Sequence, residues 1–100
     1  IYSGAKNLAE NLVAEDGSIG IRITRETFSK RLCEQFRKPI VSTSANISNT
    51  TAPKSFSEID ENIKNNVDYI VDYRQNEKIK ATASSIIKLE VNGQITIIRK

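Results

Sequence analysis

The stretch Pro39-Ile-Val-Ser-Thr-Ser-Ala-Asn-Ile-Ser48 sets the interpretation of the whole sequence. It begins with apolar, mostly β-branched residues and changes abruptly to hydroxyls and one carboxamide. A buried strand that delivers polar groups at its carboxyl end has this pattern, and open α/β sheets bind their ligands just beyond such ends. Alternation along the strand places Ser42 and Ser44 on one face, and Asn46 follows in a turn. These groups suit a phosphate or the head group of an amino acid, although an ordinary Ser/Thr/Asn loop has the same composition.

A second strand is predicted over residues 18–24, where isoleucines alternate with polar or small residues. The isoleucine face can be buried in a core. Ser18, Gly20 and Arg22 lie on the opposite face, and Gly20 leaves room for a ligand to approach the backbone. Arg22 then offers a planar fork to a carboxylate or a phosphate. The alternative is an amphipathic edge strand whose Arg22 side chain lies in water.

The remaining periodicity predicts helices that alternate with strands, which is the pattern of an α/β domain with a mixed sheet layered with helices. The expected helices cover residues 5–13 and 24–37, with a third that begins at a capping box over residues 55–58; further strands are expected from Pro39, over residues 67–73, and over 84–89 and 94–99 as a hairpin around Asn92-Gly93.

Several kinds of chemistry are excluded within this chain by its composition. It has one cysteine, Cys33, and no histidine, so it can form neither an internal disulfide nor a zinc-type ligand cluster, and it lacks a Ser–His or Cys–His pair. Asp68 and Asp72 flank a predicted strand, where solvated carboxylates are common. We therefore expect no metal site among the protein side chains and no catalytic nucleophile or base.

The charge is weakly positive and evenly spread. The net charge is +3, with 7 basic side chains in residues 1–50 and 8 in residues 51–100. This suits small anions and is compatible with RNA, but no basic stripe or set of stacking aromatics indicates an RNA reader. With no signal-like or long apolar run, we expect a cytoplasmic protein with no membrane segment.

Four segments, each a weak signal alone, occur in an order and at a rough spacing that resemble the YrdC-like family of threonylcarbamoyl-AMP synthases. They are Gly17-Ser-Ile-Gly-Ile-Arg-Ile-Thr24, Ser42-Thr-Ser-Ala-Asn-Ile-Ser48, Ala83-Ser-Ser-Ile-Ile-Lys-Leu89 and Ile97-Ile-Arg-Lys100.

The resemblance implies a YrdC-like (RibB-like) fold, a mixed twisted sheet layered with helices, with residues 1–100 as the carboxy-terminal portion of one domain. The family's Pro-Thr-Asp-Thr and Lys-x-Arg segments have no counterpart here, and the chain begins at Ile1 and contains no methionine. We therefore expect a partial domain. A sheet edge left exposed in it would invite dimerisation.

The resemblance also implies a reaction. L-threonine and bicarbonate give a carbamate, which attacks the α-phosphate of ATP; pyrophosphate leaves and threonylcarbamoyl-AMP supplies the t6A modification of transfer RNA. Mg²⁺ would accompany ATP. Without the missing cations we expect the chain alone to be inactive. RNA or the tRNA threonylcarbamoyl-transfer machinery are further expected partners. The alternative is an RNA-binding YrdC-like module or a regulatory paralogue without synthase activity.

Individual residues carry this resemblance. Asn49 stands where the family usually has glycine, and asparagine is the next best residue for a positive φ. Ser85 is an alternative to Ser84 at one threonine contact. By position, the residues that resemble ATP contacts are Ser18, Ser44, Asn46 and Arg99, and those that resemble L-threonine contacts are Arg22, Ser42 and Ser84.

Overall fold

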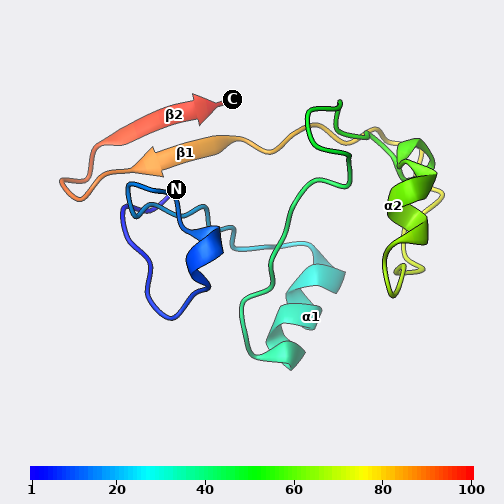
Figure 1. Cartoon of the computed structure of the whole chain (residues 1–100), viewed down its shortest axis with the longest axis horizontal. Helices are drawn as coiled ribbons and strands as arrows, with labels where there is room; N and C mark the ends of the chain where they lie inside the picture. Colours follow the sequence, from blue (N-terminus) through cyan, green and yellow to red (C-terminus); the bar gives the residue numbers. More distant parts are fainter. The chain divides into compact units, whose positions relative to one another are not determined.

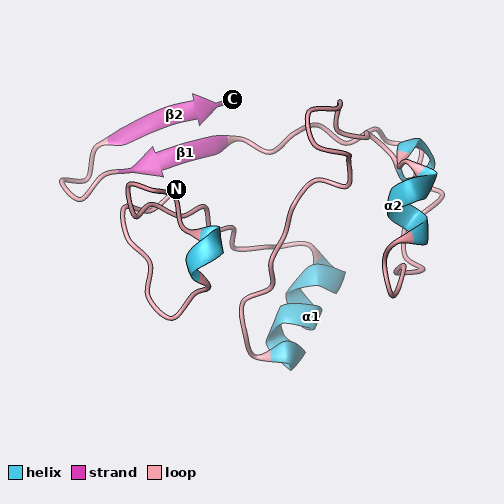
Figure 2. Ribbon diagram, in the orientation of Figure 1, coloured by secondary structure: helices cyan, strands magenta, loops and turns pink.

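The computed structural model describes residues 1–100 and contains short helices and one antiparallel pair of strands (Figures 1 and 2). The chain divides into two compact units, Ile1–Pro39 with Ser84–Lys100, and Ile40–Ala83. The presence of both helices and paired strands is compatible with part of an α/β domain. The elements are the 3-10 helices η1 (Glu10–Leu12) and η2 (Phe56–Glu58), the α-helices α1 (Thr27–Phe36) and α2 (Glu61–Asn65), and the strands β1 (Ile86–Leu89) and β2 (Ile95–Arg99).

Tyr2 joins two parts of the first unit. Its N–H donates to the carbonyl oxygen of Ile19 at 2.9 Å, and its own carbonyl accepts from the Ile19 N–H at 3.0 Å. On its other side it forms a parallel bridge with Leu89, whose N–H donates to the Ile1 carbonyl at 2.9 Å. The chain start therefore lies beside β1 (Figure 1). Because β1 pairs with β2 in the antiparallel sense, this unit combines parallel and antiparallel contacts.

Ile19 is the buried hydrophobic residue of this unit, with 6% of its surface exposed. The prediction that the isoleucines of residues 18–24 are buried is confirmed for Ile19 and wrong for the other two. Ile21 is half exposed and Ile23 is 82% exposed. Only Ile19 has a bridging partner, so only there does a neighbouring segment cover the side chain.

The strand predicted over residues 18–24 does not form beyond the single bridge at Ile19, and two other predicted strands are absent from the structure. Neither the segment that begins at Pro39 nor residues 67–73 join a sheet. Val41 is 67% exposed and Tyr69 is 79% exposed. A strand needs a neighbour that accepts and donates along its backbone, and β-propensity alone cannot supply that neighbour.

The helix predicted over residues 24–37 is present as α1, but it begins later than predicted. Its N-cap residue is Glu26. The Glu26 carboxylate accepts from the N–H of Phe28 at 3.1 Å and from the N–H of Ser29 at 2.8 Å. The cap thereby satisfies N–H groups that have no partner inside the helix.

The other two helix predictions hold only in part. The expected helix over residues 5–13 is reduced to the 3-10 turn η1. The expected capping box does not form, because the Ser55 side chain makes no cap bond and Glu58 instead accepts from the N–H of Lys54 at 2.8 Å. The longer helix α2 begins after this turn and is capped by Asp60.

The predicted hairpin is confirmed. β1 and β2 pair antiparallel, with Leu89 opposite Ile95, and the turn lies around Asn92-Gly93. Gly93 has φ of 85°, which only glycine adopts without strain. None of the helices has the length and apolar character needed to cross a membrane.

We expect substitution of Glu26 by alanine to lower the free energy of unfolding of the whole protein by about 0.5–2 kcal/mol, because two N–H groups of α1 lose their acceptor. Denaturant unfolding measures this change. The matched control is Glu34→Ala in the same helix, since exposed Glu34 only approaches Lys30 at 4.0 Å. An equal loss in both variants would contradict the capping role of Glu26.

Candidate functional site

The seven residues predicted to bind substrates divide between the two units. The structure brings some of them together within a unit. The first unit holds Ser18, Arg22, Ser84 and Arg99, and the second unit holds Ser42, Ser44 and Asn46.

In the second unit, Asn46 closes the turn that follows the hydroxyl-rich segment. Its amide Nδ2 donates to the carbonyl oxygens of Ile47 at 2.9 Å and Thr50 at 3.1 Å. Thr50 returns two bonds to the Ile47 carbonyl, from its N–H at 3.0 Å and from Oγ1 at 2.6 Å. Asn49 has φ of 67°, so the prediction of a positive φ there is confirmed. The turn is therefore held by four hydrogen bonds within five residues.

Ser42 and Ser44 differ from Asn46 because their hydroxyls are available. Both residues are exposed, and their side chains make no hydrogen bond within the protein. Each hydroxyl can donate one proton and accept two hydrogen bonds. Asn46 is half-buried, and its Oδ1 is buried without a partner. This segment can thus offer free donors to an anion directly before a fastened turn.

In the first unit, Ser18 is engaged by the carboxylate of Asp16. The Ser18 N–H donates to Asp16 Oδ1 at 2.9 Å, and the intervening Gly17 has φ of 80°. The Ser18 side chain, then its N–H, and more weakly the charge of Lys88 hold the pKa of Asp16 below its usual value. A ligand that took the Ser18 hydroxyl would therefore compete with Asp16. Asp16 was not among the residues predicted from the sequence, although Asp-Gly-Ser is a common side-chain-stabilised turn.

Arg99 contacts Ser84, and the contact is to the backbone of Ser84 and not to its hydroxyl. The guanidinium of Arg99 donates to the Ser84 carbonyl oxygen from Nε at 2.8 Å and from Nη2 at 2.5 Å. The Ser84 side chain remains exposed. Arg22, by contrast, is exposed and forms no ion pair or hydrogen bond, so its guanidinium is free for a carboxylate.

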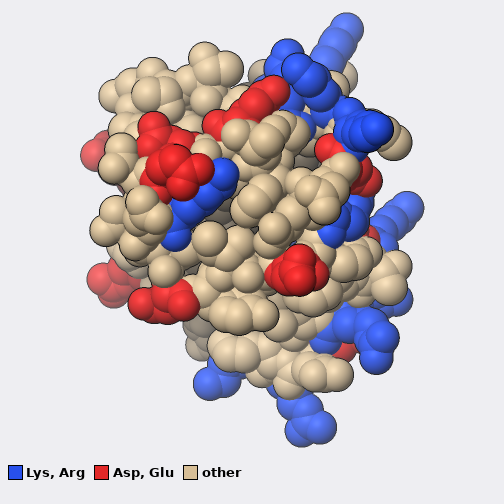
Figure 3. All heavy atoms as spheres, turned by 90° about the vertical axis from the view of Figure 1, so that its right-hand side faces the viewer, with Lys and Arg blue, Asp and Glu red and all other residues tan.

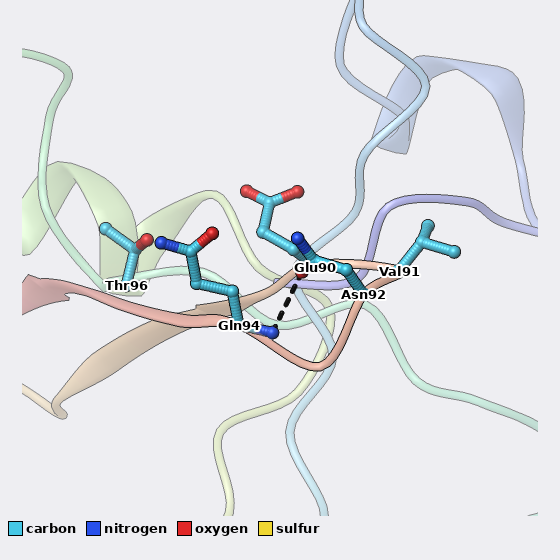
Figure 4. A pocket seen from close by; sticks show the side chains of 5 residues that line it. All are labelled: Glu90, Val91, Asn92, Gln94 and Thr96. Atoms are coloured by element: carbon cyan, nitrogen blue, oxygen red, sulfur yellow. Dashed lines mark hydrogen bonds between the residues drawn. The ribbon is translucent and has the colours of Figure 1, made fainter.

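A shallow hollow lies at the tip of the hairpin and contains none of the predicted residues (Figure 4). In it the Gln94 N–H donates to Asn92 Oδ1 at 2.9 Å, which is the bond drawn in Figure 4. The hollow is open and comes from a single turn, so it lacks the enclosure of a small-molecule site. Its lining consists of Glu90, Val91, Asn92, Gln94 and Thr96.

Charged side chains of both signs lie on the face shown in Figure 3. Glu58 accepts a hydrogen bond from the N–H of Lys54 and forms an ion pair with the ammonium of Lys80, 3.3 Å away. These two contacts hold the pKa of Glu58 below its usual value. No group of three or more histidine, cysteine or acidic side chains is arranged to hold a metal ion.

The sequence matches one protein family over its whole length. Residues 1–100 match the model of the Sua5/YciO/YrdC family, whose description is "Telomere recombination". A threonylcarbamoyl-AMP synthase of Pseudoalteromonas translucida (strain TAC 125) is 34% identical over 95 residues, which are 95% of this chain and 49% of that protein. A protein of Methanocaldococcus jannaschii named putative threonylcarbamoyl-AMP synthase is 38% identical over 87 residues, which are 87% of this chain and 39% of that protein.

A third relative, a threonylcarbamoyl-AMP synthase of Psychromonas ingrahamii, is 33% identical over 66 residues. The chain spans about half the length, or less, of the curated relatives it matches. No solved structure matches it.

We expect the Asp16 carboxyl group to titrate below the ordinary aspartate value, and substitution of Ser18 by alanine to raise its pKa, because the Ser18 side chain is the largest cause of the shift. Since folding lowers this pKa, the ionised carboxylate stabilises the loop at pH values above the ordinary aspartate pKa. This stabilisation is lost as the pH falls through the lowered pKa of the folded protein. A carbon-13 NMR titration of the side-chain carboxyls measures the pKa of Asp16 in the wild type and in the variant. Glu58 is the internal control, since its shift arises elsewhere; an unchanged Asp16 in the variant would refute the assignment.

Proposed function

The chain belongs to the Sua5/YciO/YrdC family, and on that premise we propose that it is the carboxy-terminal part of a threonylcarbamoyl-AMP synthase. The match of residues 1–100 to the family is the observation that carries the proposal, and the names of the relatives support it. In the whole protein the substrates are L-threonine, bicarbonate and ATP, and the product serves the t6A modification of transfer RNA in the cytoplasm.

The free groups of this chain suit the parts of that substrate set. The exposed hydroxyls of Ser42 and Ser44 can donate to oxygen acceptors, and the unpaired guanidinium of Arg22 fits a carboxylate. We assign ATP contacts to Ser18, Ser44 and Arg99, a place in the same ATP subsite to Asn46, and L-threonine contacts to Arg22, Ser42 and Ser84.

The proposed chemistry needs positioned anions more than a reactive side chain. The threonine amine attacks the carbon of bicarbonate and water is lost, which gives a carbamate. A carbamate oxygen then bonds to the α-phosphorus of ATP, and the bond from that phosphorus to the pyrophosphate oxygen breaks, so that pyrophosphate leaves. The chain has no histidine to act as a base, and its role is to bind and orient. Mg²⁺ would enter as part of the Mg–ATP substrate and share in stabilising the charge of the phosphates.

The finer fold follows from the same premise. We propose that the segments 18–24, 39–44 and 67–73 become strands of a YrdC-like mixed sheet when the rest of the protein pairs with them. Their exposed apolar side chains support this, since a surface of that kind is usually covered in a complete domain. The same open edges could pair between two copies.

We expect the whole protein to release pyrophosphate when L-threonine, bicarbonate and ATP are all present, and the 100-residue chain alone to be at least about 100-fold slower, because cations that stabilise the phosphates are missing from it. A coupled pyrophosphate assay measures both rates. Turnover by the isolated chain would overturn the partial-site proposal. An inactive whole protein that binds RNA with a steep salt dependence would favour the RNA-binding alternative.

We expect Arg22→Lys in the whole protein to raise the KM for L-threonine by roughly 10- to 100-fold, because lysine cannot make the two parallel hydrogen bonds of a guanidinium with a carboxylate. Steady-state kinetics with each substrate varied in turn measures this. Arg25→Lys is the matched control, since Arg25 is an exposed arginine three residues further along. A change in the KM for ATP alone would contradict the threonine assignment and indicate that Arg22 binds the nucleotide.

A further inference from the structure

We propose that Asn46 is a positioning residue: its amide group fastens the turn of residues 46–50, and this turn holds Ser44 in place for the nucleotide. The inference rests on the proposed function and assigns Asn46 a role that acts through the backbone.

The carbonyl oxygen of Ile47 is the centre of the turn. It accepts three hydrogen bonds, from Asn46 Nδ2 at 2.9 Å, from the Thr50 N–H at 3.0 Å and from Thr50 Oγ1 at 2.6 Å. The second proton of Asn46 Nδ2 goes to the Thr50 carbonyl at 3.1 Å. The Asn46 side chain and the Thr50 hydroxyl therefore act on the same backbone group from opposite ends of the turn.

The orientation of the Asn46 amide follows from its neighbours. Both atoms in contact with Nδ2 are carbonyl oxygens, which only accept hydrogen bonds. A flipped amide would place a third acceptor against them and would be repelled. The NH₂ group therefore faces the turn, and the buried Oδ1, which has no partner, faces away from it.

This geometry limits what Asn46 can do for ATP. Phosphate oxygens are acceptors, and both protons of the Asn46 amide are already used within the turn. As long as the turn is closed, Asn46 cannot donate to a phosphate. Ser44 lies two residues earlier with a free, exposed hydroxyl, and it is the group able to donate. Asn46 then affects the nucleotide by fixing the backbone that presents Ser44.

Thr50 provides a test that does not touch the predicted site. Thr50→Val removes the hydroxyl that binds the Ile47 carbonyl and keeps the side-chain shape. Thr51→Val is the matched control, because Thr51 is exposed and makes no hydrogen bond. Asn46→Ala and the double variant Asn46→Ala/Thr50→Val complete a cycle in the whole protein.

Two readouts separate positioning from direct contact. We expect Thr50→Val and Asn46→Ala each to raise the KM for ATP by roughly 3- to 10-fold with the KM for L-threonine unchanged, and the double variant to exceed the worse single variant by less than about twofold, because both act on one turn. We also expect the Thr50 amide to exchange its hydrogen faster in both single variants, since its bond to Ile47 is weakened. Thr51→Val should match the wild type in both.

A rise in the KM for ATP in Asn46→Ala but not in Thr50→Val, or fully multiplicative effects in the double variant, would overturn the inference and favour direct contact. Unchanged exchange of the Thr50 amide in both single variants would overturn it as well. Hydrogen exchange needs no substrate, so the fastening of the turn is tested even if the whole protein has no synthase activity. Such inactivity would refute the proposed function separately.

Discussion

Every backbone N–H and C=O in a sheet needs a hydrogen-bond partner, and the supply of partners governs which strand-like segments of this chain pair. Tyr2 meets the requirement on both sides, through Ile19 and through the start of the chain beside β1. Around it lies the well-buried residue Ile19. Beyond Ile19 the isoleucine pattern continues, but no neighbour pairs with it, and Ile23 remains in water.

Short-range hydrogen bonds organise the candidate site where the sheet does not. Asp16 holds Ser18, Asn46 and Thr50 hold the Ile47 carbonyl, and each of these contacts spans at most four residues. Such contacts need no distant strand, because a side chain and a nearby backbone group meet through local geometry alone. The site segments can therefore take a defined conformation although their surroundings are open.

The free and the engaged polar groups form a consistent division of roles. Asparagine and aspartate side chains hold the backbone, while the hydroxyls of Ser42 and Ser44 and the guanidinium of Arg22 stay available. Arg99 is an exception among the predicted ligand contacts, since its guanidinium is bound to the Ser84 carbonyl. A nucleotide that bound Arg99 would have to share its guanidinium with the Ser84 carbonyl.

The sequence by itself determined what depends on neighbouring residues: the hairpin at Asn92-Gly93, a helix near residues 24–37, the positive φ of Asn49 and the family. It also placed Ser42, Ser44 and Asn46 together. Only the tertiary structure decided that Arg99 binds the Ser84 carbonyl and that residues 67–73 form no strand. Turns and caps draw on residues a few positions apart, whereas a strand exists only when another segment supplies its hydrogen bonds, and periodicity does not show whether that segment is within reach.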